Sequence, residues 1–185
     1  MLQLCAQNPT GVVLGAERAH SLAELLGGTS TLVVEDDSAG PTSVAPPVRR
    51  LADAGVTVGI GTITDLGDVH RAADAGARFV VSFRCPPGFV AAARERDLLP
   101  VPGALTPSEV HASHAEGAGL IKLFLAGMIT PGYLSELAPL VPGAEYVISG
   151  GIRLNPEVLA AWRGADEVRR RAARAVELVS EVAGS

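Results

Sequence analysis

The stretch LLPVPGALTPSEVHASHAEGAGLIKLF (residues 98–124) contains two short apolar runs with a helical pattern between them. The runs are LLPVPG (98–103) and LIKLF (120–124). Between them, Thr106 precedes a proline and stands three residues before Glu109, the capping-box arrangement that begins a helix. Strands that are apolar on both faces and alternate with helices belong to parallel sheets. The stretch therefore predicts a strand, a helix and a second strand parallel to the first.

The same alternation recurs along the chain at intervals of roughly 20–25 residues. The further apolar runs are GVVLG (11–15), TLVVE (31–35), VTVGIG (56–61), RFVVS (78–82) and EYVIS (145–149). This repetition favours one α/β domain over residues 1–185, a (β/α)8 TIM-type barrel, with an open doubly wound sheet as the alternative. The C-terminal segment EVRRRAARAVELVSEVAGS has a helical pattern where an eighth strand is expected, so strand eight is predicted to be missing or atypical.

Composition excludes several classes of protein. The chain has 185 residues, 48% hydrophobic and 19% charged, which is too apolar for a disordered protein. A net charge of −5 argues against a nucleic-acid-binding surface. No apolar run has the length of a membrane span, and the N-terminus lacks the pattern of a signal peptide. Two distant cysteines suggest reduced thiols. We therefore expect a cytoplasmic protein with no membrane or nucleic-acid partner.

Lys122 is the only lysine of the chain, since the other 14 of its 15 basic residues are arginines. It stands between Ile121 and Leu123 in a run that predicts a buried strand. Burial of an ammonium favours the neutral amine, which attacks carbonyl carbons and forms Schiff bases. The alternative is a lysine that reaches the surface from a strand end or pairs with Glu35. Its isolation and its apolar neighbours favour a catalytic role.

Residues at the C-terminal ends of barrel strands form a common candidate site, because barrel enzymes place their chemistry there. Glu35 is a candidate for proton transfer, and Thr62 offers a hydroxyl to an anion. Gly150 and Gly151 form a possible backbone cradle for a carboxylate or phosphate. The other members of this set are Ser82, Arg84, Pro102 and Ser149. The alternatives are a solvated loop for Glu35 and a plain strand-to-helix turn for Thr62.

The histidines and cysteines give weaker signals. His111 and His114 share one face of a predicted helix, but that helix belongs on the outside of a barrel, away from the strand ends. A solvated surface is therefore expected there rather than a metal site. Cys85 follows a strand, and a packed, unreactive thiol is expected. Neither a metal nor a cofactor is predicted.

The order of the motifs VVE, VGIGT, FVVS…PPG, LPVPGALTPSE, IKLF and ISGGI resembles the 2-keto-3-deoxy-6-phosphogluconate / 4-hydroxy-2-oxoglutarate (KDPG/KHG) aldolase family over residues 11–165. The resemblance implies a class I aldolase, usually a homotrimer, on a (β/α)8 barrel without a metal. It implies a Schiff base between Lys122 and pyruvate, with Glu35 as general acid/base acting through water. It also implies that Thr62 holds the pyruvate carboxylate and that Gly150 and Gly151 line the site of a distal phosphate.

The chain departs from the family pattern mainly at the phosphate end. Ala39 stands where the family usually has an arginine, VVLGAE replaces the expected VLRG, LFLA replaces FFPA, and ISGG replaces PTGG. The glycine-serine turn after strand eight has no counterpart. A phosphate dianion needs such donors, so we expect weak binding of a phosphorylated substrate. Arg84 and Arg153 are extra arginines that either recognise a different anion or are ordinary surface charges.

The sequence thus predicts a lyase of specialised metabolism that acts on a 2-oxo acid, through iminium and enamine intermediates, with a non-phosphorylated aldehyde as the partner. Two alternatives stay open. One is a decarboxylase or dehydratase that uses the same imine. The other is a non-catalytic barrel that binds a small anion.

Overall fold

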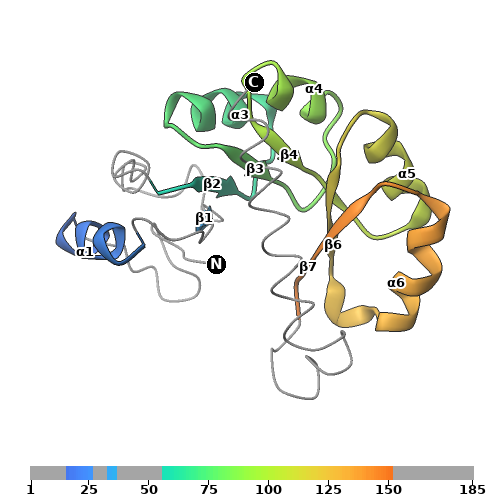
Figure 1. The fold of residues 1–185 in the computed structure, drawn as a ribbon. Coiled ribbons are helices and arrows are strands. Elements are labelled where there is room, and N and C mark those ends of the chain that lie inside the picture. Colours follow the sequence, from blue (N-terminus) through green and yellow to red (C-terminus); the bar gives the residue numbers. More distant parts are fainter. Residues whose placement is uncertain (1–15, 27–32, 37–55, 152–185) are drawn as a thin grey trace.

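Strands and helices alternate in the computed structural model, which describes residues 16–26, 33–36 and 56–151 (Figure 1). The strands are β1 (Val33–Asp36), β2 (Val58–Gly61), β3 (Phe79–Val81), β4 (Leu99–Val101), β5 (Gly103–Ala104), β6 (Leu120–Phe124) and β7 (Glu145–Ser149). The α-helices are α1 (Ala16–Leu26), α3 (Leu66–Asp74), α4 (Phe89–Arg94), α5 (Pro107–Ala115) and α6 (Pro131–Leu137). Two 3-10 turns, η2 (Ala126–Met128) and η3 (Ala138–Leu140), flank α6.

All paired strands are parallel, and their order in space follows their order in the chain. The order is β1-β2-β3-β4 in one sheet and β5-β6-β7 in the next. A doubly wound sheet reverses its strand order at one point, and the described strands show no reversal. Figure 1 shows the helices α3, α4, α5 and α6 following one another outside the strands. This arrangement is the (β/α)8 barrel that the sequence predicts.

The run at residues 98–103, predicted as one strand, is divided at Pro102. β4 pairs with β3, whereas β5, which begins one residue after Pro102, pairs with β6. Proline has no N–H group and cannot donate to a neighbouring strand. Its carbonyl oxygen still accepts a hydrogen bond from the amide of Lys122, at 2.8 Å. One extended segment therefore joins the two sheets edge to edge, and the strands form a continuous barrel wall.

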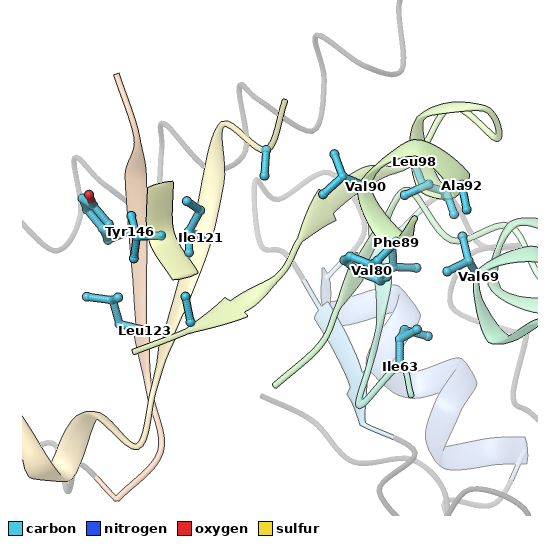
Figure 2. Packing of buried hydrophobic residues seen from close by; sticks show 14 of the residues in the cluster. Ile63, Val69, Val80, Phe89, Val90, Ala92, Leu98, Ile121, Leu123 and Tyr146 are labelled. Atoms are coloured by element: carbon cyan, nitrogen blue, oxygen red, sulfur yellow. The ribbon is translucent and has the colours of Figure 1, made fainter. Parts of the chain in front are cut away.

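The core has an outer and an inner layer. The outer layer lies between the strands and the helices, and Val80, Phe89, Ile121 and Leu123 are fully buried in it (Figure 2). The inner layer, inside the barrel, contains Phe79, Leu99, Val101 and Leu120. Side chains alternate between the two faces of a strand, so Leu120 and Ile121 enter different layers.

The predicted capping box at the start of α5 is confirmed. The Thr106 hydroxyl accepts the amide hydrogen of Glu109 at 3.3 Å, and the Glu109 carboxylate accepts the amide hydrogen of Thr106 at 2.8 Å. The strand predicted at 11–15, the C-terminal segment with a helical pattern and the position of strand eight lie outside the described residues.

Candidate active site

Lys122 lies on the inward face of β6, two residues after the buried Leu120. Its side chain is half-buried, and Nζ stands 4.7 Å from the centroid of the Phe124 ring. The sequence predicted a buried strand, and Leu120, Ile121 and Leu123 are buried. The inner face instead becomes more accessible toward Phe124, because the barrel opens at the end where its strands finish. We call this end the mouth.

The contact between Lys122 and Phe124 directs the lysine side chain. An ammonium over the face of an aromatic ring gains about 0.5–1 kcal/mol at partly exposed sites. Phe124 follows Lys122 by two residues, so strand alternation places both on the inward face. The amine is therefore held along the inside of the barrel wall and aimed toward the mouth.

Pro102 and Gly103 support Lys122 from the neighbouring strand. The Pro102 carbonyl accepts the Lys122 amide hydrogen, and Gly103 is the register partner of Lys122. A Cβ atom on Gly103 would lie 2.1 Å from the carbonyl carbon of Phe83. The backbone of the β3–α4 loop can pass across this position only because residue 103 is glycine. Pro102 thus reaches Lys122 through its backbone.

Ser82 and Arg84 connect the loops that follow β2 and β3. The Ser82 side chain is fully buried, and its hydroxyl donates to the Ile63 carbonyl at 2.6 Å. The same hydroxyl accepts the Arg84 amide hydrogen at 3.3 Å. The exposed Arg84 guanidinium donates through Nη2 to the Thr64 carbonyl at 2.7 Å. Both residues therefore hold the rim of the mouth together, and substrate contact by either of them stays a prediction.

Thr62 has a strained backbone directly after β2. Its φ is +60°, in the left-handed region that β-branched residues rarely adopt. The side chain is half-buried. Backbone strain of this kind costs of order 1–3 kcal/mol and gathers at functional positions. The strain makes Thr62 a candidate functional position, and its role in binding stays a prediction.

Ser149, Gly150 and Gly151 end β7 beside Phe124. Ser149 is the register partner of Phe124, and the two glycines have φ of +92° and +77°. The Gly150 carbonyl accepts the Gly127 amide hydrogen at 2.7 Å. The glycine pair therefore takes a backbone path that other residues disfavour, and it contacts the loop after β6.

Only the backbone of Glu35 is described, and its strand pairing places it near the end of β1. The backbone of Glu35 pairs with that of Ile60 in β2, one residue before the end of that strand. Its side chain lies outside the description, as does all of Arg153. The role of Glu35 stays a prediction.

Parallel strands bring most of these residues to one end of the barrel. Lys122 lies within β6 and Glu35 lies one residue before the end of β1, whereas the remaining described residues predicted for the site stand at or after the ends of β2, β3, β4 and β7. Phe83 and Phe124 were not predicted for the site. Phe124 was detectable from its two-residue spacing to Lys122. Phe83 had no such signal, because only the path of the loop between β3 and α4 brings it near Phe124. The two ring centroids are 6.1 Å apart.

The weaker candidates have packing explanations. His111 is exposed on α5, and His114 is half-buried with Nδ1 3.0 Å from the Ala118 carbonyl oxygen. Within residues 16–26, 33–36 and 56–151, no three acidic, histidine or cysteine side chains form a metal-binding group. Burial raises the pKa of the Cys85 thiol, which makes it less reactive. The same part of the chain contains no helix long and apolar enough to cross a bilayer.

Comparison with known proteins agrees with this barrel. Residues 16–165 match the family model of KDPG and KHG aldolases. The chain therefore belongs to the KDPG and KHG aldolase family. It is 29% identical over 126 residues to a probable 2-dehydro-3-deoxy-6-phosphogalactonate aldolase of Rhizobium meliloti (strain 1021), covering 68% of this chain and 59% of the relative. The match thus spans less than two thirds of that relative's length.

Solved structures show the same fold. A native KDPGal structure has a TM-score of 0.63 at 20% identity, and the match covers 90% of this chain and 89% of that one. The KDPG aldolase of Legionella pneumophila, solved with pyruvate captured as a covalent carbinolamine, has a TM-score of 0.57 at 21% identity. That match covers 89% of this chain and 84% of the Legionella chain.

Proposed function

We propose that this chain is a class I aldolase that makes or breaks the C3–C4 bond, at the carbon next to the carbonyl of pyruvate or another 2-oxo acid. The observation that carries the proposal is Lys122, a single lysine on the inward face of β6, held over Phe124 at the barrel mouth. Family membership supports it, and so does the covalent pyruvate adduct of the Legionella relative.

The chemistry needs one amine and a proton carrier. The neutral Lys122 amine adds to the C2 carbonyl, and loss of water from the carbinolamine gives an iminium ion. In cleavage, a base takes the proton of the C4 hydroxyl, and the electron pair of the C3–C4 bond moves into the iminium to form an enamine. The aldehyde leaves, C3 takes up a proton, and water hydrolyses the imine to release the 2-oxo acid. We assign the proton transfers to Glu35 acting through water, and the substrate carboxylate to Thr62.

The charges at the mouth support a partner aldehyde without a phosphate group. Helix N-termini often bind phosphates, but the first turns of α3 and α5 already carry carboxylates. Asp65 accepts the Asp68 amide hydrogen at 3.0 Å and caps α3. Hydrogen bonds from the backbone of Thr106 and of Leu105 hold the pKa of Glu109, in α5, below its usual 4.5. These carboxylates disfavour a phosphate dianion at the N-termini of α3 and α5 and already accept hydrogen bonds from backbone donors there.

The test is reduction with borohydride in the presence of pyruvate, followed by intact-mass measurement. Because Lys122 is the only lysine, a side-chain adduct can form at one position alone. We expect the adduct in the unchanged protein and its loss in Lys122→Ala and in Lys122→Arg. Arginine keeps the charge without a reactive amine, so it separates loss of charge from loss of chemistry.

Each other result counts against part of the proposal. Absence of an adduct, or its persistence in Lys122→Ala, contradicts the Schiff-base mechanism and favours the anion-binding barrel. Trapping without aldol turnover favours a decarboxylase or dehydratase. High turnover of 2-keto-3-deoxy-6-phosphogluconate contradicts the non-phosphorylated partner.

The homotrimer and the cytoplasmic location are further proposals, supported by the family resemblance and the sequence pattern. Light scattering coupled to size-exclusion chromatography measures the number of subunits directly.

A further inference from the structure

Large apolar side chains are exposed at the mouth. Among the described residues, the exposed large apolar side chains are Leu25, Leu66, Phe83, Leu125, Met128 and Leu140. Leu66, Phe83, Leu125 and Met128 stand in segments that directly follow β2, β3 or β6. Single exposed apolar residues are common on protein surfaces. Their concentration at the end that holds the candidate lysine indicates a binding surface.

Phe83 is connected to Lys122 by a short series of contacts. Nζ of Lys122 lies 4.7 Å from the Phe124 centroid, and the Phe124 centroid lies 6.1 Å from that of Phe83. The Phe83 backbone packs on Gly103, the register partner of Lys122. Phe83 nevertheless remains 41% exposed. Phe83 therefore lies next to the ring that contacts the amine, and it has surface open to a ligand.

The loop after β6 adds two more apolar side chains. Leu125 has a φ of +66°, which proline cannot adopt. The usual family sequence FFPA therefore cannot follow this path at the position where this chain has LFLA. The Leu125 and Met128 side chains are 47% and 77% exposed, and the Met128 amide donates to the Leu125 carbonyl at 2.9 Å. The two residues thus belong to one turn that directly follows Phe124.

Resting on the aldolase function proposed above, we propose that Phe83, Phe124, Leu125 and Met128 form an apolar subsite for the aldehyde partner. The subsite takes an aromatic or branched aliphatic group on the aldehyde carbon. The aldehyde carbon bonds to C3 of the bound 2-oxo acid, and C3 is two bonds from Nζ. The substituent on the aldehyde carbon can therefore reach the Phe124 ring, which contacts Nζ. The exposed Phe83 ring loses unfavourable contact with water when a second apolar group covers it.

The charged side chains that follow the strand ends already have hydrogen-bond partners, so they do not favour a charged substituent on the aldehyde. Arg84, the residue next to Phe83, directs its Nη2 atom to the Thr64 carbonyl. Glu109 and Asp65 are engaged in helix caps. An anionic or strongly polar substituent would lose hydration against the aromatic rings, whereas burial of an apolar one is favourable.

The first experiment compares aldehyde acceptors at saturating pyruvate. The acceptors are benzaldehyde, glyceraldehyde and glyceraldehyde 3-phosphate, and the quantity is kcat/KM for each. We expect benzaldehyde to be preferred, and Phe83→Ala to lower the ratio of benzaldehyde to glyceraldehyde kcat/KM about tenfold. Phe83→Leu should restore most of the ratio. Leu140→Ala is the control, because Leu140 is also an exposed large apolar residue but lies in η3, away from the C-terminal strand ends.

A second experiment tests the subsite without catalysis. The ¹⁹F line of 4-fluorobenzyl alcohol, which forms no imine, should broaden in the presence of the protein, and Phe83→Ala should remove most of the broadening. Borohydride trapping with pyruvate, on the same samples, reports the amine separately. A protein that binds the fluorinated ring but forms no adduct retains the subsite and disproves the aldolase function.

Three results overturn the subsite. One is an equal loss for polar and aromatic aldehydes in Phe83→Ala. Another is unchanged ¹⁹F broadening in that variant. The third is dissociation of an oligomer by Phe83→Ala with an unchanged acceptor ratio, which would make this surface an interface between copies of the chain.

Discussion

The two faces of β6 are made from adjacent residues but have different surroundings. Ile121 and Leu123 point outward into the layer beneath the helices and have no exposed surface. On the inward face, Leu120 is buried, whereas Lys122 and Phe124 are half-buried. The outer face is packed along its whole length, while the inner face opens toward the mouth.

The comparison shows how a barrel separates stability from chemistry within one strand. A fully buried leucine contributes to stability through many close contacts, and losing them leaves a cavity. A half-buried lysine at an opening has fewer such contacts and can change without unfolding the chain. The stability of the barrel therefore depends on the outer layer and not on the candidate site.

The largest expected effect on stability comes from comparing substitutions at adjacent positions on the two faces of β6. Leu123→Ala should lower the free energy of unfolding by about 3–5 kcal/mol, because it leaves a cavity in a fully buried layer. Lys122→Met should change it by about 1 kcal/mol or less while abolishing the pyruvate adduct. Urea unfolding followed by circular dichroism, with trapping on the same samples, measures both. Comparable destabilisation by the two variants would contradict the division between the faces.

Gly103 extends the comparison to the strand beside Lys122. Gly103→Ala places a Cβ atom against the backbone of Phe83 and Arg84, so we expect about 1–3 kcal/mol of destabilisation by overpacking. The displaced β3–α4 loop should also lower aldol turnover. Gly119→Ala is the control, since a Cβ atom there meets nothing within 4 Å. Equal melting temperatures for the two variants would show that this loop does not need glycine at residue 103.

Thr62 tests whether strain at the mouth serves binding. Thr62→Gly relieves the positive φ, and we expect the protein to become about 0.5–1 kcal/mol more stable. The KM for pyruvate should rise, because the hydroxyl is lost. Thr64→Gly is the control, since Thr64 is not among the described residues with a positive φ. The Thr64→Gly variant should therefore be less stable than the unchanged protein, because glycine relieves no strain there. A stabilised variant with unchanged KM would leave Thr62 without a binding role.

The smallest expected effect concerns the cap of α5. Glu109→Gln should cost about 0.5 kcal/mol near pH 7, because a negative charge at a helix N-terminus is stabilising. The pKa of Glu109 is lower in the folded protein, so its contribution is complete above about pH 4.5 and is lost as the pH falls through that lowered pKa. Thermal unfolding of both proteins between pH 3 and 7 measures this. Glu116→Gln, at the other end of α5, is the control and should not destabilise the protein. If the stability difference between the unchanged protein and Glu109→Gln grew as the pH fell, the capping role of the Glu109 carboxylate would be contradicted.

Several elements were predictable because their signals are local. β6 and β7 begin and end where the apolar runs do, and the α5 cap follows from the spacing of Thr106 and Glu109. The division at Pro102 was not predicted, although proline's missing N–H is itself a sequence property. Whether one segment pairs with β3, with β6 or with both depends on where those strands lie.

The sequence by itself determined the alternation of strands and helices, the single lysine and the bounds of β6 and β7. These features depend on side-chain periodicity and on backbone preferences of neighbouring residues. Only the tertiary structure decided that Phe83 approaches Phe124 and that Leu125 takes a left-handed conformation in the loop after β6. The physical reason is that loop paths depend on contacts between segments distant in sequence. Here a glycine at residue 103 lets one such loop approach the strand wall beside Lys122.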